Sequence, residues 1–573
     1  MTCKCSFQSR FIGSIFAALL AFLLFSCSSN PQKTNSDFDK FVAEYDSVVK
    51  PIYKEMNRAA WEAAISGDKI DFDRLAEWKK KYMAYHSSKD RFKILEEFKG
   101  SEDITDAVKA RELDVLYLMF LSNQADVDIQ QQIIDKENII EEKFNAFRAK
   151  IDGKSYSDND IEDILKNSVD QKQLEAAWKA HKEIGPLVAA YIIELVKLRN
   201  KLASQLGFGN FHEMSLRISE QDPNEIERLF DELDELTGKS FIIVKNELDS
   251  ILALRLKINK KDLMPWDYQN RYFQQAPGIY NIKPDKYFAG KNIETIAKSF
   301  YKSIGLPVND IIKRSHLYEK PGKNQHAFCI DIDNEGDVRV LCNLKSNAMW
   351  MNTMLHELGH AVYYKNIDRD LPFILRQPAH SLTTEAIAMM FGRLYSNPAW
   401  LADMKLCSKA EADEIAQQFF NNIRLEQLVF SRWVQVMYRF EKAMYENPDQ
   451  DLNTLWWQLV EKYQLIRKPE GRNMPDWATK IHIAAYPCYY HNYLMGELLA
   501  SQLNHYIKVE ILKDTIASGW PTYVNRPEVG EYLKKKVFGP GARYYWNDMI
   551  EKATGEKLSA KYYAEDFVVS KLK

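Results

Sequence analysis

Residues 349–365 have the sequence MWMNTMLHELGHAVYYK, a largely apolar stretch that carries two histidines. His356 and His360 are four positions apart, so on an α-helix their side chains lie on the same face. Neutral imidazole is a common zinc ligand, with a bond length of about 2.0–2.1 Å. This HExxH pattern therefore predicts a buried metal-binding helix, around which the rest of the chain must fold.

Glu357 stands next to the first of these histidines. On a helix it cannot share their face closely enough to be a third ligand, but it stays beside the metal. A carboxylate in that place can take a proton from the attacking water. The motif therefore predicts a general base as well as two ligands.

A catalytic zinc ion takes three protein ligands and keeps one position open, so a third ligand should lie on a later element. Glu385 is the one acidic residue of the apolar stretch 383–390, 25 residues after His360. Burying a carboxylate there is costly unless it is paired or bound to a metal. His380 is the alternative, but it follows Pro378 in an expected loop. We therefore favour Glu385 as the third ligand.

Composition sets the protein class. The 573 residues are 46% hydrophobic and 27% charged, with 22 glycines and 19 prolines. So little glycine and proline argues against collagen-like and disordered chains and favours long helices. The formal net charge is −3, so the chain has no basic excess for binding phosphates. We expect a folded helical protein without a nucleic-acid partner.

Helical periodicity covers most of the chain, and one segment departs from it. Residues 327–344 alternate on both sides of Asn334-Glu335-Gly336-Asp337, which predicts a β-hairpin. We expect a mostly α-helical fold around a cleft, with a small β-sheet near the active site. Residues 263–292 are aromatic and irregular. Helical periodicity is found over 37–150, 159–207, 223–258 and most of the chain from residue 346. Within the first range, one helix opens at Asp37, and further helices are expected over 71–98, 103–123 and 127–150.

The N-terminus has the features of a targeting segment. Lys4 and Arg10 precede an apolar run from Phe11 to Phe25, which is too short for a membrane-spanning helix. The run ends in Leu24-Phe25-Ser26-Cys27, which resembles the lipobox of bacterial lipoproteins; an ordinary signal peptide cleaved near Ser26 is the alternative. We predict a signal peptide over 1–27 with a lipidated Cys27, a polar tether over 28–36 and one domain over 37–573. This organisation places the domain outside the cytoplasm, held to a membrane by the lipid alone.

Four cysteines follow this segment: Cys329, Cys342, Cys407 and Cys488. None forms a CxxC motif, so neither a thiolate zinc site nor a redox motif is indicated. Cys329 and Cys342 flank the expected hairpin turn and could pair in an oxidising compartment. A disulfide and two buried free thiols both remain open from the sequence.

Further motifs accompany HELGH in a fixed order: His326-Ala327 before it, then Tyr363-Tyr364, Asp370-Leu371-Pro372, Leu375-Arg376, Glu385-Ala386-Ile387 and Lys480-Ile481-His482-Ile483. This order resembles the angiotensin-converting enzyme family of zinc peptidyl-dipeptidases, most densely over 326–500. Residues 486–496 are equally similar to the related oligoendopeptidase F and thimet oligopeptidase. The resemblance implies a large two-lobed cleft fold of the gluzincin type, with one catalytic Zn²⁺ and short peptides as substrates.

The resemblance also implies roles for individual residues. His356, His360 and Glu385 would bind zinc, and Glu357 would act as general base and acid. His482 would hydrogen-bond the substrate carbonyl, and Tyr493 would stabilise the oxyanion; the converting-enzyme spacing would instead put Asn492 at that position. The substrate-binding candidates are His326 and Ala327 as an edge strand, Lys480 and Tyr489 for the substrate carboxylate, and Tyr486.

Three features depart from the converting-enzyme pattern, and one of them is His491, which stands where that family has a chloride-binding arginine. Met389 stands where that family has an aspartate that steadies a ligand histidine, so another group must do this here. That family also adds a glutamine from a Trp-rich segment to its carboxylate site, and Trp266-Asp267-Tyr268-Gln269 does not place one cleanly.

The sequence leaves four possible functions, of which a structural or partner-docking helical protein without a metal is the least favoured. The favoured one is an extracytoplasmic zinc peptidase that releases C-terminal dipeptides. An oligoendopeptidase that cuts within short peptides is the second. A lipoprotein that binds peptides without cleaving them is the third, although such a protein has no need of Glu357. The oligomeric state is not indicated.

Overall fold

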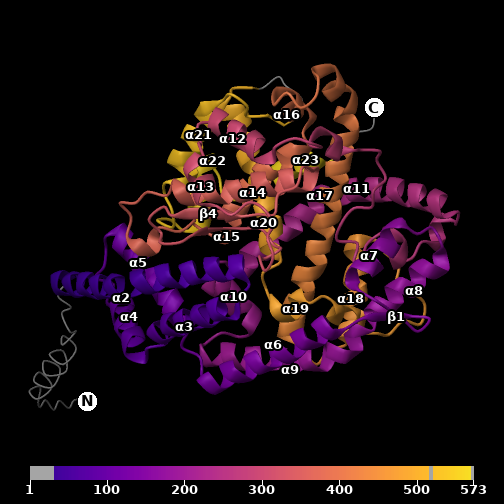
Figure 1. The fold of residues 1–573 in the computed structure, drawn as a ribbon. Helices are drawn as coiled ribbons and strands as arrows, with labels where there is room; N and C mark the ends of the chain where they lie inside the picture. Colours follow the sequence, from indigo (N-terminus) through magenta and orange to yellow (C-terminus); the bar gives the residue numbers. More distant parts are fainter. Residues whose placement is uncertain (1–30, 515–519, 569–573) are drawn as a thin grey trace, which may run out of the picture.

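The computed structural model describes residues 31–514 and 520–568, and in them the chain is mostly helical, as predicted (Figure 1). The predicted signal peptide and Cys27 lie outside the described residues. Residues 31–36, which were expected to belong to a polar tether, form the first turns of helix α2 (Pro31–Ser66). Within the described part, no helix is both long and apolar enough to cross a membrane.

The N-terminal half is a series of helices whose starts are fixed by side-chain caps. Asp106, Asp126, Asp170 and Asp222 each accept hydrogen bonds from first-turn backbone N–H groups, which satisfies donors that a helix leaves unpaired. These helices are α2, α3 (Lys69–His86), α4 (Lys89–Ser101), α5 (Ala107–Leu121), α6 (Val127–Ala146), α7 (Asp158–Asn167), α8 (Gln171–Lys182), α9 (Ile184–Gln205), α10 (Phe211–Ile218) and α11 (Pro223–Leu256).

Two expected helices in this half are wrong in detail. The helix predicted over 71–98 is divided between α3 and α4, because Ser88 caps a new helix by accepting a bond from the Arg91 N–H. The helix predicted over 127–150 ends at Ala146, and residues 149–151 pair with 154–156 as the antiparallel strands β1 (Ala149–Ile151) and β2 (Lys154–Tyr156).

The C-terminal half contains the metal-binding segment. Between the halves, residues 263–292 are irregular with short 3-10 turns, as predicted. The helices are α12 (Ile293–Ser303), α13 (Asn309–Arg314), α14 (Ala348–Lys365), α15 (Ser381–Gly392), α16 (Pro398–Asp403), α17 (Lys409–Glu446), α18 (Leu452–Leu459), α19 (His482–Ala485), α20 (His491–Tyr506), α21 (Pro527–Leu533), α22 (Trp546–Thr554) and α23 (Lys561–Phe567).

The predicted hairpin is confirmed as strands β3 (Phe328–Asp331) and β4 (Val338–Leu341), which pair antiparallel. The register places Cys329 opposite Val340, while Cys342 follows the end of β4. Both cysteines are free thiols, so the disulfide alternative is wrong and the free-thiol alternative holds.

Helix α15 packs against both α14 and α20 in the middle of the molecule (Figure 1). Two glycines allow their backbones to approach closely. A Cβ at Gly359 of α14 would lie 2.8 Å from Cα of Ala388 on α15, and one at Gly496 of α20 would lie 3.2 Å from Cβ of Glu385. Because larger residues would push these helices apart, Gly359 sets the close approach of the HExxH helix to the helix of Glu385, and Gly496 sets that of α20 to the same helix.

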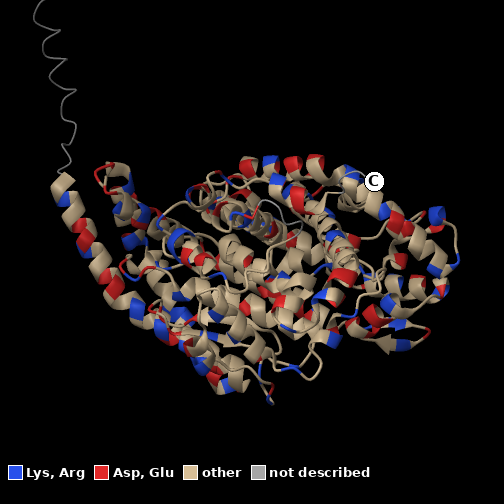
Figure 2. Cartoon of the chain, turned by 90° about the horizontal axis from the view of Figure 1, so that it is seen from above, with Lys and Arg blue, Asp and Glu red and all other residues tan. Residues whose placement is uncertain are grey.

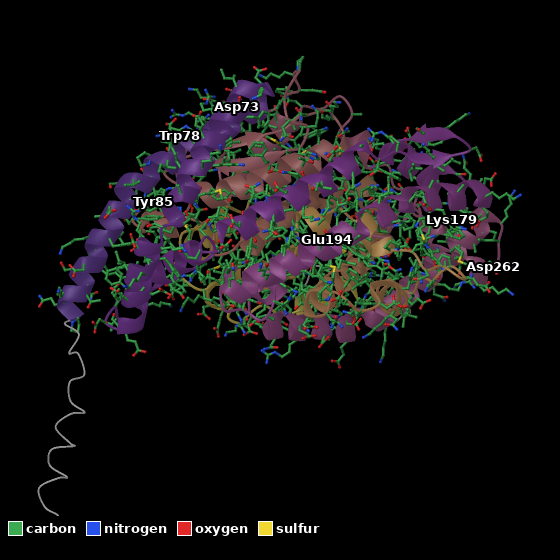
Figure 3. All side chains as sticks on the ribbon, turned by 90° about the horizontal axis from the view of Figure 1, so that it is seen from below. Asp73, Trp78, Tyr85, Lys179, Glu194 and Asp262 are labelled. Atoms are coloured by element: carbon green, nitrogen blue, oxygen red, sulfur yellow. The ribbon has the colours of Figure 1, made fainter. Side chains whose placement is uncertain are left out.

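Helices α2, α3, α4, α6 and α9 lie below this core in Figure 1. Figure 3 shows this face, with Tyr85 on α3, Glu194 on α9 and Lys179 on α8. Seen from above, basic and acidic residues are interspersed along the surface helices (Figure 2). Mixed charge of this kind creates no strong electrostatic field of one sign on these helices.

Candidate zinc-peptidase site

Helices α14 and α15 bring the three predicted ligands together. Nε2 of His356 lies 3.2 Å from Nε2 of His360, and Oε2 of Glu385 lies 3.7 and 3.9 Å from these two nitrogens. A point equidistant from the three atoms lies about 2.1 Å from each, which is the length of a zinc bond to imidazole or carboxylate. Among the described residues, this is the one group of His, Cys, Asp and Glu placed to hold a metal ion. The donor set fits a single Zn²⁺.

His380 does not compete for this role. Its Nδ1 accepts a hydrogen bond from the backbone N–H of Leu382 at 3.1 Å, so the ring caps the N-terminus of α15. Its side chain is not part of the metal-binding group. The choice of Glu385 over His380 is confirmed.

The ligands line a cavity of ≈ 640 Å³. Four more predicted residues also line it: Ala327 next to strand β3, Glu357 on α14, Tyr489, and Tyr493 on α20. Glu357 is 8% exposed, so its carboxyl faces this cavity from within the core. The cavity therefore brings a candidate base and candidate hydrogen-bond donors around the metal ligands.

Burial dominates the electrostatics of the cavity. It lowers the pKa of His356 to about 4, and together with the His356 ring it lowers the pKa of His360, so both imidazoles are neutral and able to bind metal. Burial also raises the pKa of Glu385 to about 7 and, with the charge of Glu385 adding, that of Glu357 to about 8. A divalent cation would favour the ionised form of both carboxyl groups.

Thr384 makes the contact to a ligand histidine that Met389, which replaces the family's aspartate, cannot make. Its hydroxyl lies 2.8 Å from Nδ1 of His360, opposite the nitrogen that faces the other ligands. A hydrogen bond at Nδ1 fixes the tautomer and the orientation of a metal-binding ring. Thr384 therefore holds His360 in its ligand orientation. The residue precedes Glu385 directly, so the same helix turn supplies a ligand and the support of another.

Thr384→Val is expected to weaken zinc binding by roughly 10–100-fold, because the isosteric side chain cannot hydrogen-bond His360. The affinity is measured on purified protein by competition with a chelator of known zinc affinity. Thr384→Ser keeps the hydroxyl and should bind zinc nearly as well as the parent protein. Equal affinity in the Val and Ser variants would contradict this role.

A second cavity, of ≈ 560 Å³, adjoins the first, and Met389 and Tyr493 line both. His482, the first residue of α19, lines this second cavity. Burial, with the charge of Lys480 adding, lowers the pKa of His482 to about 4. His482 is therefore a neutral ring near pH 7 that can donate one hydrogen bond into the cavity.

Lys480 makes a contact that the sequence did not reveal. Its Nζ donates to Oε1 of Gln274 at 2.6 Å, and Gln274 lines the second cavity. The ammonium also lies 5.6 Å from the ring centre of Tyr490. Burial, with the charge of Arg271 adding, lowers the pKa of Lys480 to about 8. The irregular segment 263–292 thus places a glutamine beside the lysine after all, at Gln274 rather than near Gln269.

The structure does not group Tyr489 with Lys480. Tyr489 lines the cavity of the metal ligands, and Tyr490 lines the cavity of Gln274 and His482. Tyr490 is therefore the tyrosine of this pair that lies beside Lys480, and the role of Tyr489 at the substrate carboxylate stays a prediction.

Two other predicted substrate residues lie outside both cavities. His326 is exposed and is absent from the residues that line them, whereas its neighbour Ala327 lines the zinc-site cavity. Tyr486 is 62% exposed and packs against the His482 ring.

Asn492 is not among the residues that line the zinc-site cavity. Its side-chain oxygen accepts a hydrogen bond from Gln221 at 2.7 Å, and the residue is buried. Of the two residues considered for the oxyanion, Tyr493 is the one that lines the zinc-site cavity.

Comparison with known proteins agrees with this geometry. The model of the angiotensin-converting enzyme family matches residues 32–268 and 274–567. The chain is 24% identical over 444 residues to the angiotensin-converting enzyme of Theromyzon tessulatum, covering 71% of this chain and 70% of that protein.

Two further relatives match over smaller parts of their own length. The angiotensin-converting enzyme of Mus musculus is 22% identical over 487 residues, which cover 78% of this chain and 36% of the mouse protein. A Caenorhabditis elegans protein described as an inactive angiotensin-converting enzyme-related protein is 21% identical over 363 residues, 56% of this chain and 40% of that protein. Because the family includes such a protein, similarity alone does not establish activity. The presence of all three metal ligands and of Glu357 in this chain is separate evidence for it. With its His-His-Glu metal site, this chain belongs to the angiotensin-converting enzyme family of zinc metallopeptidases.

Proposed function

We propose that this peptidase cuts short peptides and releases dipeptides from their C-terminal ends. The observation that carries the proposal is the contact between Lys480 and Gln274 beside the second cavity. A buried ammonium and an amide can both donate to the free carboxylate of a peptide. Because the two cavities share Met389 and Tyr493, a carboxylate bound there would lie a short distance beyond the bond being cut.

Each residue of the site has a separate role in the proposed hydrolysis. His356, His360 and Glu385 would hold a zinc ion, which would supply Lewis-acid polarisation of the scissile carbonyl and lower the pKa of water. Glu357 takes the proton of the attacking water and passes it to the leaving amine. His482 and Tyr493 donate hydrogen bonds to the carbonyl oxygen as it gains negative charge. Lys480 and Gln274 hold the far end of the substrate, which orients the peptide bond in the cavity.

Lys480→Ala is expected to abolish a preference for substrates with a free C-terminus. A charge-assisted hydrogen bond contributes about 1.5–3 kcal/mol, so the wild-type enzyme should cleave a free-acid peptide roughly 10–150-fold better than its amide. The ratio of the two kcat/KM values measures this preference. In the variant the ratio should fall to about one, while the exposed-site control Lys462→Ala should keep it.

The same ratio should decrease as the pH rises through about 8. The ammonium of Lys480 loses its proton above that pKa, and kcat/KM reports the free enzyme. Equal cleavage of the free acid and the amide by the wild type would favour the oligoendopeptidase alternative.

We also propose that the protein works outside the cytoplasm as a lipoprotein. The support is the sequence of residues 1–27, with its basic start, short apolar run and terminal cysteine. Cys27→Ser is expected to move the protein from the membrane fraction to the soluble extracytoplasmic fraction, because the lipid would be its one anchor. Fractionation followed by immunoblotting measures the change, and continued membrane association of the variant would mean another attachment.

A further inference from the structure

Two carboxylates line the second cavity, and one of them, that of Glu426, forms no ion pair with any residue that the structure describes. Glu426 and Phe430 lie one turn apart on α17 and line the cavity together, while Tyr493 and Glu497 face it in the same way from α20. Two acidic side chains therefore meet the same space from two helices.

The two carboxylates differ in their partners. Glu497 forms an ion pair with Arg393 and accepts a hydrogen bond from Gln427 at 3.1 Å. Glu426 accepts a hydrogen bond from the Asn422 amide at 2.8 Å. No nitrogen of Lys, Arg or His in residues 31–514 and 520–568 forms an ion pair with Glu426. Glu497 is thus neutralised within the protein, and Glu426 is not.

Glu426 is accessible from the cavity, because its side chain is exposed. Enough protein surrounds it that desolvation raises the pKa of its carboxyl. A cation entering the cavity would relieve this penalty, since an opposite charge favours the ionised form. The remaining wall is apolar where Met389, Phe430 and Tyr490 line it.

The second cavity lies between the groups that would bind the two ends of the released dipeptide. It shares Tyr493 with the zinc-site cavity, and Gln274, the partner of Lys480, lines it too. A peptide whose carboxylate binds Lys480 and whose scissile carbonyl lies at Tyr493 would place the two residues between these points beside Glu426.

We propose that Glu426 makes this enzyme selective for a basic side chain, Lys or Arg, in the dipeptide that it releases. The inference rests on the proposed dipeptide release. The methylene stem of a Lys or Arg side chain would pack on the apolar wall, and its charged head would pair with Glu426. A leucine in the same place would bury the carboxylate further without a partner, which disfavours it.

The test uses the zinc-loaded mature protein and N-terminally blocked peptides with free C-termini. In one series the last residue is arginine, citrulline or leucine, and in a second series the penultimate residue varies in the same way. Citrulline keeps the shape of arginine and removes its charge. In one of the two series, kcat/KM should be about tenfold higher for arginine than for citrulline.

Glu426→Gln should lower this arginine-to-citrulline ratio to about one while the citrulline peptide is still cleaved, because glutamine can keep the bond from Asn422. Glu414→Gln is the matched control: the residue is exposed on α17, twelve positions before Glu426, and should leave the ratio unchanged. Glu426→Lys should reverse the preference, so that a peptide with glutamate in the same position is cleaved with a higher kcat/KM than the arginine peptide.

Three outcomes would overturn the inference, and they separate it from the function on which it rests. Release of dipeptides with equal kcat/KM for arginine and citrulline in both series removes the role of Glu426 and leaves dipeptide release intact. An arginine preference that persists in Glu426→Gln assigns the selectivity to another residue. Failure to release a dipeptide from any of the peptides overturns both proposals.

Discussion

Glu357→Gln is expected to keep one zinc ion per chain while peptidase activity falls by roughly 10²–10⁴-fold or more. The amide has nearly the same shape as the carboxyl, and the three ligands, His356, His360 and Glu385, are untouched. An amide cannot accept the proton of the attacking water, so the step that Glu357 assists is lost. Metal analysis and kcat/KM on a free-acid peptide measure the two quantities on the same preparation.

The matched variant His356→Ala should lose both zinc and activity, because two ligands hold the ion much less well than three. The pair of variants therefore separates binding of the metal from its use. Near-normal hydrolysis by Glu357→Gln with zinc bound would show that the proton is taken by another group, and the assigned mechanism would be wrong.

Local spacing explains why the metal site could be predicted from the sequence. His356 and His360 are one helical turn apart, so their common direction follows from helix geometry alone. Glu385 could be recognised because a single carboxylate in an apolar helix needs a partner. What the sequence did not show is how α14 and α15 come so close, which depends on Gly359 meeting the backbone of Ala388.

The substrate side of the site could not be predicted in the same way. Lys480 and Gln274 are 206 positions apart, and Gln274 lies in a segment without periodicity, so no pattern pairs them. Counting from His482 also failed to distinguish Tyr489 from Tyr490. The chain turns at Cys488, whose φ of +54° is in the left-handed region, so side-chain directions after it do not follow a helical count.

The same limit applies to short strands. The turn at Asp152-Gly153 is visible in the sequence, but β1 and β2 contain three residues each, too few for an alternating pattern to show. Positive φ values at both turn residues, +49° and +78°, suit the tight hairpin that the structure contains. The helix predicted up to residue 150 was therefore extended four residues too far.

Tyr493→Phe is expected to lower kcat by about 10²–10³-fold with a much smaller change in KM. The phenol lines both the zinc-site cavity and the cavity of His482, so it can reach the carbonyl oxygen of a peptide that spans them. Burial raises the pKa of Tyr493 to about 12, which keeps the hydroxyl protonated and able to donate at neutral pH. Phenylalanine keeps the ring packing and removes only this donor.

Tyr489→Phe is the informative comparison, because Tyr489 lines the same cavity and its ring centre lies 5.4 Å from that of Tyr493. A donor to the developing oxyanion acts mainly in the transition state, so its loss should appear in kcat, whereas loss of a substrate contact should appear in KM. We expect the large decrease in kcat for Tyr493→Phe alone. If Tyr489→Phe showed that decrease and Tyr493→Phe did not, the oxyanion role would belong to Tyr489, and the register taken from the oligopeptidases would be wrong.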